Sequence, residues 1–297
     1  MDAPLLAIIQ KTLEIVFAIF ALVAVGYFYG RRSPTDMSVA NKINTDVFLP
    51  ALIFGVMSSQ AFSIAAYSDL AIAATLIIIG SGLLAWPISH LLGVRPKTFV
   101  PPMMFNNCGN LGLPLLVLAF GEDALPAAVM LFVVSNTLHF TLGAYMVGAD
   151  KNPLNLLKQP MIAATLLGLV WSVLSWPMPN AVSISLDMLG QVSVPLLLFA
   201  LGVRMNDVNF AMWRIGLWGA IVAPATGLVV GIPAVYLLDL SATNAAYVIL
   251  FASLPPAVLN YIVAERQNQQ PELVAPMVLI GNMGAVITIP VALFFVL

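Results

Sequence analysis

The sequence contains very little charge. Only 8% of its 297 residues are Asp, Glu, Lys or Arg, whereas 61% are apolar. An average soluble domain carries about 25% charged residues, so this chain has too little polar surface to cover a soluble globule. The composition therefore excludes a soluble globular enzyme, a disordered chain and a nucleic-acid-binding protein.

Thiol and metal chemistry also lack their usual residues. The chain has one cysteine and two histidines. A single cysteine excludes a disulfide framework, a cysteine-based zinc site and an iron–sulfur site. No acidic cluster indicates a metal site, so we expect neither a metal nor a cofactor. The first residues lack a basic segment before their apolar run, and we interpret them as a retained first helix.

Long apolar runs fill most of the chain. A helix that spans a bilayer needs about 20 predominantly apolar residues, and ten ranges meet this requirement. We therefore expect an all-α polytopic membrane protein with ten spans in the lipid bilayer. The ten ranges are 5–29, 38–59, 66–92, 98–120, 124–147, 160–177, 183–203, 212–238, 242–265 and 272–296.

The basic residues predict an orientation for these spans. By the positive-inside rule, basic loops face the cytoplasm. Apart from Lys11, all Lys and Arg residues lie in or beside the connections after the odd-numbered spans, so both termini are expected outside. They are Arg31, Arg32, Lys42, Arg95, Lys97, Lys151, Lys158, Arg204, Arg214 and Arg266.

The chain divides into two similar halves, 1–148 and 154–297. Each half has five spans, so two equivalent halves must run in opposite directions across the membrane. At an offset of about 145 residues, Val47-Phe48-Leu49-Pro50 matches Val192-Ser193-Val194-Pro195. Further matches place Asp46 opposite Gln191, Phe105 opposite Phe251, Asn110 opposite Pro256, and Asn136 opposite Asn282.

Helix-breaking residues interrupt the fourth and ninth spans at matching places. Proline, glycine and asparagine in the middle of a span destabilise a regular helix in lipid. Broken helices in two inverted halves are typical of the substrate site of a secondary transporter. The residues are Asn106, Asn107, Gly109, Asn110, Gly112 and Pro114 in the fourth span, and Pro255 and Pro256 in the ninth.

At these residues the chain resembles the auxin efflux carrier family, which includes bacterial carriers for small dicarboxylates and plant carriers for auxin. The resemblance covers nearly the whole chain and is most specific at Asn107-Cys108-Gly109-Asn110-Leu111-Gly112-Leu113-Pro114, followed by Gly121-Glu122. Supporting stretches are Phe48-Leu49-Pro50-Ala51-Leu52-Ile53-Phe54, Pro195-Leu196-Leu197-Leu198-Phe199-Ala200-Leu201-Gly202 and Pro255-Pro256-Ala257. One departure is Pro256, where the family often has a small polar residue.

The resemblance implies two five-helix repeats, with the broken fourth and ninth helices crossing each other. It also implies a homodimer and an elevator-like motion of spans 3–5 and 8–10 against a scaffold of spans 1, 2, 6 and 7. The long central loop of many plant members is absent, which indicates a bacterial-type carrier in the inner (plasma) membrane.

We expect the substrate, a small carboxylate, at the crossing. Asn106, Asn107 and Asn110 either bind it or satisfy backbone groups that the breaks leave unpaired. Gly109 and Gly112 would allow close backbone crossing, and Pro114 and Pro256 would open the first turns of the resumed half-helices. Two helix N-termini there would attract a carboxylate without a basic side chain nearby. Asn260, one turn after Pro256, either adds a donor or links helices.

Three residues are candidates for coupling transport to H⁺ or Na⁺. Asp46 either takes up a proton or cation or pairs with Lys42 one turn away, and Gln191 occupies the matching place in the second half. His139 either titrates or packs as a hydrogen-bonded core residue. Asn136 and Asn282 either line the site from behind the crossing or link helices.

The sequence thus predicts a secondary active transporter for a small organic anion. A sodium-coupled bile-acid-type symporter is the alternative, although such carriers tend to place an acidic residue at the crossing. An intramembrane enzyme is a more remote alternative, because neither histidine has the neighbours that a protease site requires.

Overall fold

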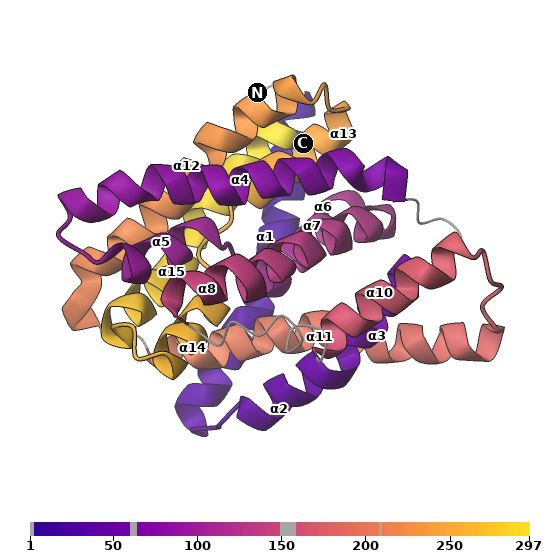
Figure 1. The fold of residues 1–297 in the computed structure, drawn as a ribbon, viewed down its shortest axis with the longest axis horizontal. Helices are drawn as coiled ribbons and strands as arrows, with labels where there is room; N and C mark the ends of the chain where they lie inside the picture. The colour runs from indigo at the N-terminus through magenta and orange to yellow at the C-terminus, as the bar shows by residue number, and fades with distance from the viewer. Residues whose placement is uncertain (1–2, 60–63, 149–158, 208–209) are drawn as a thin grey trace.

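The computed structural model describes residues 3–59, 64–148, 159–207 and 210–297, and every regular element within these ranges is a helix (Figure 1). The connection that carries Lys151 and Lys158 lies outside the described residues, as does the boundary between the two predicted halves.

Six stretches of helix are long and apolar enough to cross a membrane, and they coincide with the first, third, fifth, seventh, eighth and tenth predicted spans. The fifth bends through a wider π-helical turn, η4. Five of the six stretches are single helices: α1 (Ala3–Arg32), α4 (Ile64–Leu91), α11 (Asn180–Arg204), α12 (Trp213–Leu237) and α15 (Pro271–Val296). The remaining stretch, which matches the fifth span, consists of η3 (Glu122–Ala124), α7 (Leu125–Leu138), η4 (His139–Gly143) and α8 (Ala144–Val147).

The other four predicted spans correspond to shorter or interrupted helices, so the count of ten crossings stays a prediction. The second consists of α2 (Ser38–Ile43), a π-helical turn η1 (Asn44–Phe48) and α3 (Leu49–Met57), and the sixth is α10 (Pro160–Val173). The fourth comprises α5 (Pro96–Met104), η2 (Cys108–Gly112) and α6 (Leu113–Phe120), and the ninth comprises α13 (Ala242–Ala252) and α14 (Val258–Arg266). Two short 3-10 turns, η5 (Met205–Asp207) and η6 (Phe210–Met212), lie between α11 and α12.

The helices form two sets of close neighbours. In one set α1 packs along α11, and α3 packs against α10 and α11. In the other, α12 packs against α15, α4 and α13, and α4 packs against α5 and α7. Figure 1 shows the second set around α4 and α12, with α2, α3, α10 and α11 grouped beside it. The π-helical turn η2, which follows the first break, contacts α11 of one set and α7 of the other.

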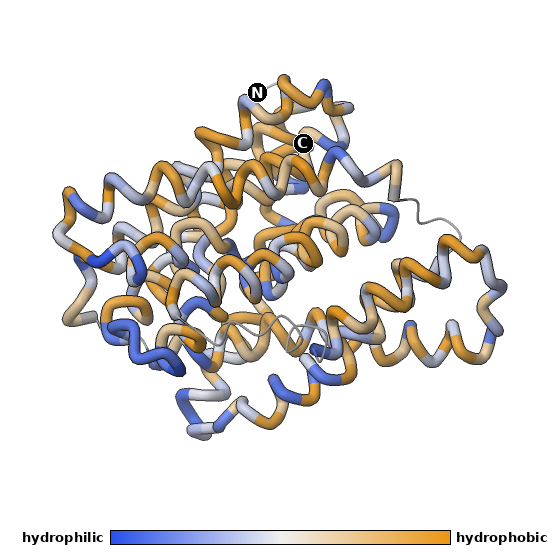
Figure 2. The backbone as a smooth tube through the Cα atoms, in the orientation of Figure 1, coloured by the Kyte–Doolittle hydropathy of each residue, from blue (hydrophilic) through white to orange (hydrophobic). Residues whose placement is uncertain are grey.

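Apolar side chains cover the outside as well as the core. Phe99, Phe105 and Phe251 are fully buried beside the breaks, while Phe17 on α1 is 76% exposed. Hydrophilic residues gather at helix ends, as at the connection from α14 to α15, whereas the middles of the helices are hydrophobic (Figure 2). An apolar surface of this kind is stable in a bilayer, because the lipid hydrocarbon around the helices is itself apolar.

Candidate functional site

The fourth and ninth predicted spans are both broken, and their breaks pair with each other. Helix α5 ends at Met104, and the chain runs extended through Phe105 before η2 begins at Cys108. Helix α13 ends at Ala252, and α14 begins at Val258 after Pro255 and Pro256. These prolines lack the amide hydrogens that a continuous helix would need, so the sequence itself explains the second break.

The two extended segments satisfy each other's backbone groups. The amide of Asn107 donates to the carbonyl of Pro255 at 2.7 Å, and the amide of Ala257 donates to the carbonyl of Phe105 at 2.9 Å. These bonds flank an isolated antiparallel bridge between Asn106 and Pro256. Irregular backbone at membrane depth is tolerated only where such bonds or a water-filled cavity satisfy it.

Two side-chain amides also donate to backbone carbonyls beside the breaks. The Nδ2 of Asn260 donates to the carbonyl of Phe105 at 2.9 Å, and the Nδ2 of Asn106 donates to the carbonyl of Phe251 at 2.6 Å. Each amide therefore links one interrupted helix to the other. For these donors, satisfying freed backbone groups is the role that the structure shows.

Asn282 on α15 forms hydrogen bonds with both broken segments. Its Nδ2 donates to the carbonyls of Pro256 at 2.9 Å and Val278 at 2.8 Å, and its Oδ1 accepts from the Nδ2 of Asn107 at 2.6 Å. Both asparagines are buried. Asn282 therefore links helices and does not line the cavity. Asn136 does line it, and its Nδ2 makes a long contact with the Met161 sulfur at 3.8 Å.

The bridge pairs the two segments that lead into the half-helices. Asn107 follows Asn106 and directly precedes Cys108, and Ala257 follows Pro256 and directly precedes Val258. Asn110 and Asn260 therefore each lie in the first turn after a bridged segment. The match of Asn110 with Pro256 between the two halves of the sequence stays a prediction.

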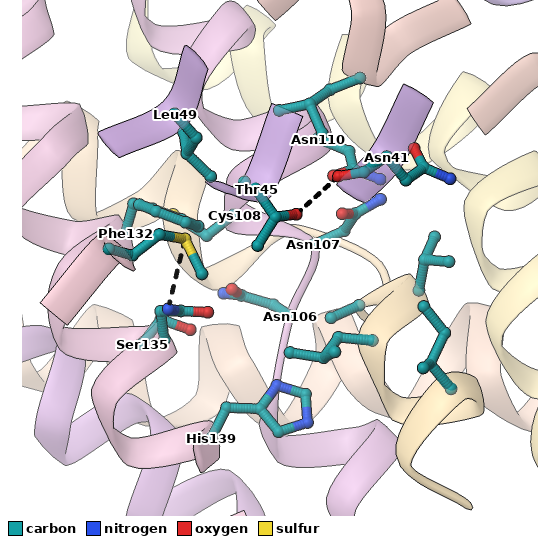
Figure 3. Close-up of a pocket in the computed structure, with 18 of the residues that line it drawn as sticks. Asn41, Thr45, Leu49, Asn106, Asn107, Cys108, Asn110, Phe132, Ser135 and His139 are labelled. Carbon is teal, nitrogen blue, oxygen red and sulfur yellow. Dashed lines mark hydrogen bonds between the residues drawn. The ribbon is translucent and has the colours of Figure 1, made fainter. Parts of the chain in front are cut away.

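A cavity of about 170 Å³ lies against the crossing. Figure 3 shows side chains of its wall. They come from both interrupted helices, from α2, η1 and α3, and from α7 and η4. It is lined by Asn41, Thr45, Leu49, Asn106, Asn107, Cys108, Gly109, Asn110, Phe132, Ser135, Asn136, His139, Phe140, Met161, Leu197, Ala200, Arg204, Ala257, Val258, Leu259 and Ile262.

The predicted site residues divide into two groups around this cavity. Six of them line it, and the others stand behind the crossing or away from it. Those that line it are Asn106, Asn107, Gly109, Asn110, Asn136 and His139. Those outside its lining are Gly112, Pro255, Pro256, Asn260, Asp46, Gln191 and Asn282.

Polar atoms without protein partners face the cavity. Asn110 is half-buried there, and within the described ranges no hydrogen bond engages its side-chain amide, unlike that of Asn260. The Oδ1 of Asn106 and the Nδ2 of Asn41 are buried and likewise have no hydrogen-bond partner. Buried polar atoms are costly unless paired, so these three amides are suited to a ligand.

The local electrostatics favour an anion. The N-terminal residues of both half-helices, Cys108 to Asn110 and Val258 to Leu259, line the cavity, and a helix N-terminus carries about half a positive charge. Among the described residues, those that line the cavity include no Asp or Glu. Among the described residues, no three His, Cys, Asp or Glu side chains lie close enough together to hold a metal ion.

A basic side chain also lines the cavity, which corrects the prediction that none lies near the breaks. Arg204, at the end of α11, contributes to the wall. The sequence analysis placed Arg204 beside a predicted cytoplasmic connection. The break that Arg204 approaches in space lies about 100 residues away in the sequence. Only the packing of α11 against η2 brings the two together.

Two further expectations about the breaks need correction. A Cβ atom at Gly109 would meet the Phe132 ring at 2.8 Å, and one at Gly112 would meet Leu254 Cδ1 at 2.8 Å. These glycines therefore make room for side chains, while the backbones cross at the bridge. Pro114 lies in the first turn of α6 as predicted, but Pro256 lies in the extended bridge before α14.

Of the coupling candidates, only His139 lines the cavity. Asp46 forms an ion pair with Lys42, the alternative that the spacing had left open, and Gln191 is exposed on α11. The buried His139 ring stacks on Phe105 with 4.2 Å between ring centroids and 7° between planes. This geometry supports a packing role for His139 directly behind the first break.

Comparison with known proteins places these features in a family. Residues 147–293 match the family model described as "Membrane transport protein". An uncharacterized transporter of Methanothermobacter thermautotrophicus is 26% identical, with 95% of this chain and 98% of that protein covered. A Rhizobium meliloti protein with a provisional malonate-transporter name is 25% identical, with 95% of each covered.

The plant carriers match over a shorter region. Auxin efflux carrier component 8 of Arabidopsis thaliana is 28% identical over 48% of this chain and 40% of that protein. These similarities confirm the resemblance that the motif around Asn110 and Gly112 indicated. The chain is thus similar over nearly its whole length to membrane transporters, residues 147–293 match the membrane transport protein family, and about half of the chain is similar to an auxin efflux carrier.

Proposed function

We propose that the protein is a secondary transporter for small organic anions, with a substrate carboxylate bound in the cavity at the crossing. The observation that carries this proposal is the unengaged amide of Asn110, which faces the cavity beside the N-termini of two half-helices. Backbone amides at a helix N-terminus bind anions without a buried cation. The described residues of the cavity wall include no acidic side chain, which supports the same ligand charge.

The size of the cavity and one relative narrow the substrate class. A cavity of about 170 Å³ suits an anion of few carbon atoms. The Rhizobium meliloti relative, similar over 95% of both chains, carries a provisional malonate-transporter name. We therefore favour small carboxylates over large amphipathic anions, which also argues against a bile-acid-type carrier.

The packing of the helices supports an elevator mechanism. The neighbours α1, α3, α10 and α11 correspond to the predicted scaffold, and α4 to α7 with α12 to α15 correspond to the predicted moving unit. The cavity lies where both units contribute side chains, so a relative shift would carry the bound anion. The exchange symmetry of the bridge between Asn106 and Pro256 supports two inverted repeats. We retain a homodimer in a bacterial inner membrane, with both termini outside, as part of the proposal.

Uptake of labelled carboxylates into proteoliposomes tests this function. We expect uptake that depends on the protein and is driven by either a proton or a sodium gradient, which identifies the coupling ion. Asn110→Leu removes the free amide where water cannot replace it, so this variant should lose transport. Asn180→Leu, at an exposed position that begins α11, is the matched control. Near-normal uptake by well-folded Asn110→Leu protein would contradict the assigned site.

A further inference from the structure

Arg204 reaches the cavity from one face of α11. Leu197, Ala200 and Arg204 follow one another at spacings of three and four residues, and all three line the cavity. Such spacing places side chains on the same face of a helix. Arg204 is therefore the last residue of this helix that lines the cavity.

Within the described ranges, no hydrogen bond or ion pair engages the Arg204 side chain. The carboxylates of Asp207, Glu265 and Asp36 act on it only through space, and two of these carboxylates are bonded elsewhere. The hydroxyl of Tyr261 donates to Glu265 at 2.9 Å, and the amide and hydroxyl of Ser38 donate to Asp36 at 2.8 and 2.7 Å. None of these carboxylates lines the cavity.

A partly buried guanidinium without a bonded partner is costly, because its desolvation is not repaid. The C-terminal position on α11 offsets some of this cost through the helix dipole. Five N–H donors in a planar fork remain, and their geometry matches a carboxylate. An anion in the cavity would supply the missing partner.

Asn41 offers a second donor on the same wall. Its Nδ2 is buried, has no hydrogen-bond partner and lines the cavity from α2. Neither Asn41 nor Arg204 belongs to the interrupted helices, which already supply Asn110 and two helix N-termini. The cavity therefore has donors on two separate structural units, one at the crossing and one on α2 and α11.

We propose that Arg204 recognises a second carboxylate of the substrate, so that the carrier selects short dicarboxylates over monocarboxylates. This inference rests on the proposed function. The first carboxylate binds at Asn110 and the half-helix N-termini, and the second pairs with the guanidinium, with Asn41 as an additional donor. Because α11 belongs to the predicted scaffold, the second contact also depends on the position of the moving unit relative to α11.

Malonate and propionate test this selection, because both have three carbon atoms and they differ in one carboxylate. Uptake of each labelled anion into proteoliposomes is measured for the wild type, Arg204→Gln, Arg204→Lys and Arg214→Gln, at a pH at which both malonate carboxyls are ionised. Arg214 is an exposed arginine at the start of α12 and provides the matched control.

We expect the wild type and Arg214→Gln to prefer malonate. A lost charge-assisted hydrogen bond corresponds to about tenfold in affinity, so Arg204→Gln should reduce malonate uptake roughly tenfold more than it reduces propionate uptake. Arg204→Lys should retain part of the preference, since it keeps the charge but loses the planar fork. Malonate should also raise the unfolding temperature of the purified wild type more than that of Arg204→Gln.

The outcomes separate this inference from the proposed function. Equal loss of malonate and propionate uptake in Arg204→Gln would indicate a structural role for Arg204 and overturn the inference alone. An unchanged preference in that variant, or a wild type that prefers propionate, would overturn it as well. A wild type that transports no carboxylate would contradict the proposed function and this inference together.

Discussion

The side-chain amide of Asn107 donates to the side-chain oxygen of Asn282 across 2.6 Å, which joins the first interrupted helix to α15 of the other half of the chain. The same Asn282 donates to the carbonyl of Pro256 in the second break. One buried side chain thus connects both breaks. Such a link fixes the two half-helix N-termini relative to each other, which any ligand bound between them requires.

Removing this link should destabilise the protein more than it changes ligand contacts, because Asn282 does not line the cavity. Asn282→Ala leaves the Asn107 amide and the Pro256 carbonyl buried without a partner. Each unsatisfied group costs about 1–3 kcal/mol, although interhelical bonds in membrane proteins often contribute less, about 0.6 kcal/mol. We expect a lower midpoint of thermal unfolding in detergent for Asn282→Ala than for Asn180→Ala. Equal midpoints would show that the hydrogen bonds of Asn282 contribute nothing to stability.

Stacking between His139 and Phe105 predicts the behaviour of two variants. His139→Phe retains an aromatic ring behind the first break and removes the titratable group, whereas His139→Ala removes both. We expect His139→Phe to transport with the pH dependence of the wild type, and His139→Ala to unfold at a lower temperature, since truncating a buried aromatic ring costs about 3–5 kcal/mol. The measurements are initial uptake rates from acid to alkaline pH and thermal unfolding. A pH profile altered in His139→Phe would identify a proton-coupling role instead.

The ion pair of Lys42 with Asp46 lies outside the cavity lining. Asn41, Thr45 and Leu49 of these elements line the cavity, and Asp46 does not. The side chains of Lys42 and Asp46 are 76% and 38% exposed, and exposed pairs contribute about 0–1 kcal/mol. We therefore expect Asp46→Asn and Lys42→Gln to have the same small effect on transport. A pH profile that shifts in Asp46→Asn but stays unchanged in Lys42→Gln would establish Asp46 as a coupling residue.

Local chemistry made the breaks predictable from the sequence. Pro255 and Pro256 cannot continue a helix, and the asparagines and glycines between Asn106 and Gly112 weaken one. The structure places interruptions in both segments. The same reasoning identified Asn110 as a cavity residue, because a polar side chain in mid-membrane needs a use.

The remaining features depend on contacts between distant segments. Nothing near Arg204 in the sequence shows that η2 packs beside it, so the cavity's basic group was missed. The different roles of Asn110 and Asn260 could not be predicted either, since both are asparagines shortly after a break. Only the packing of the two breaks shows that Asn260 donates to the carbonyl of Phe105, whereas Asn110 lines the cavity.

Cys108 tests whether the anion occupies the half-helix N-terminus. It is the chain's only cysteine, and it lines the cavity although its side chain is just 3% exposed. A small methanethiosulfonate reagent should therefore modify it slowly in purified protein. Saturating malonate should slow the reaction further, because an anion held at the adjacent amides covers the thiol and opposes thiolate formation nearby. The rate is measured as the mass shift of the intact protein over time.

Two controls make the protection by malonate specific to the cavity. Cys108→Ser should show no mass shift, which confirms that the reagent reads this one thiol. Asn110→Leu should be modified at a rate that malonate does not change, since the variant has lost the amide that holds the first carboxylate. Propionate, which carries one carboxylate, should protect the wild type at higher concentration than malonate. Modification of the wild type at the same rate with and without every transported anion would place the bound substrate away from η2.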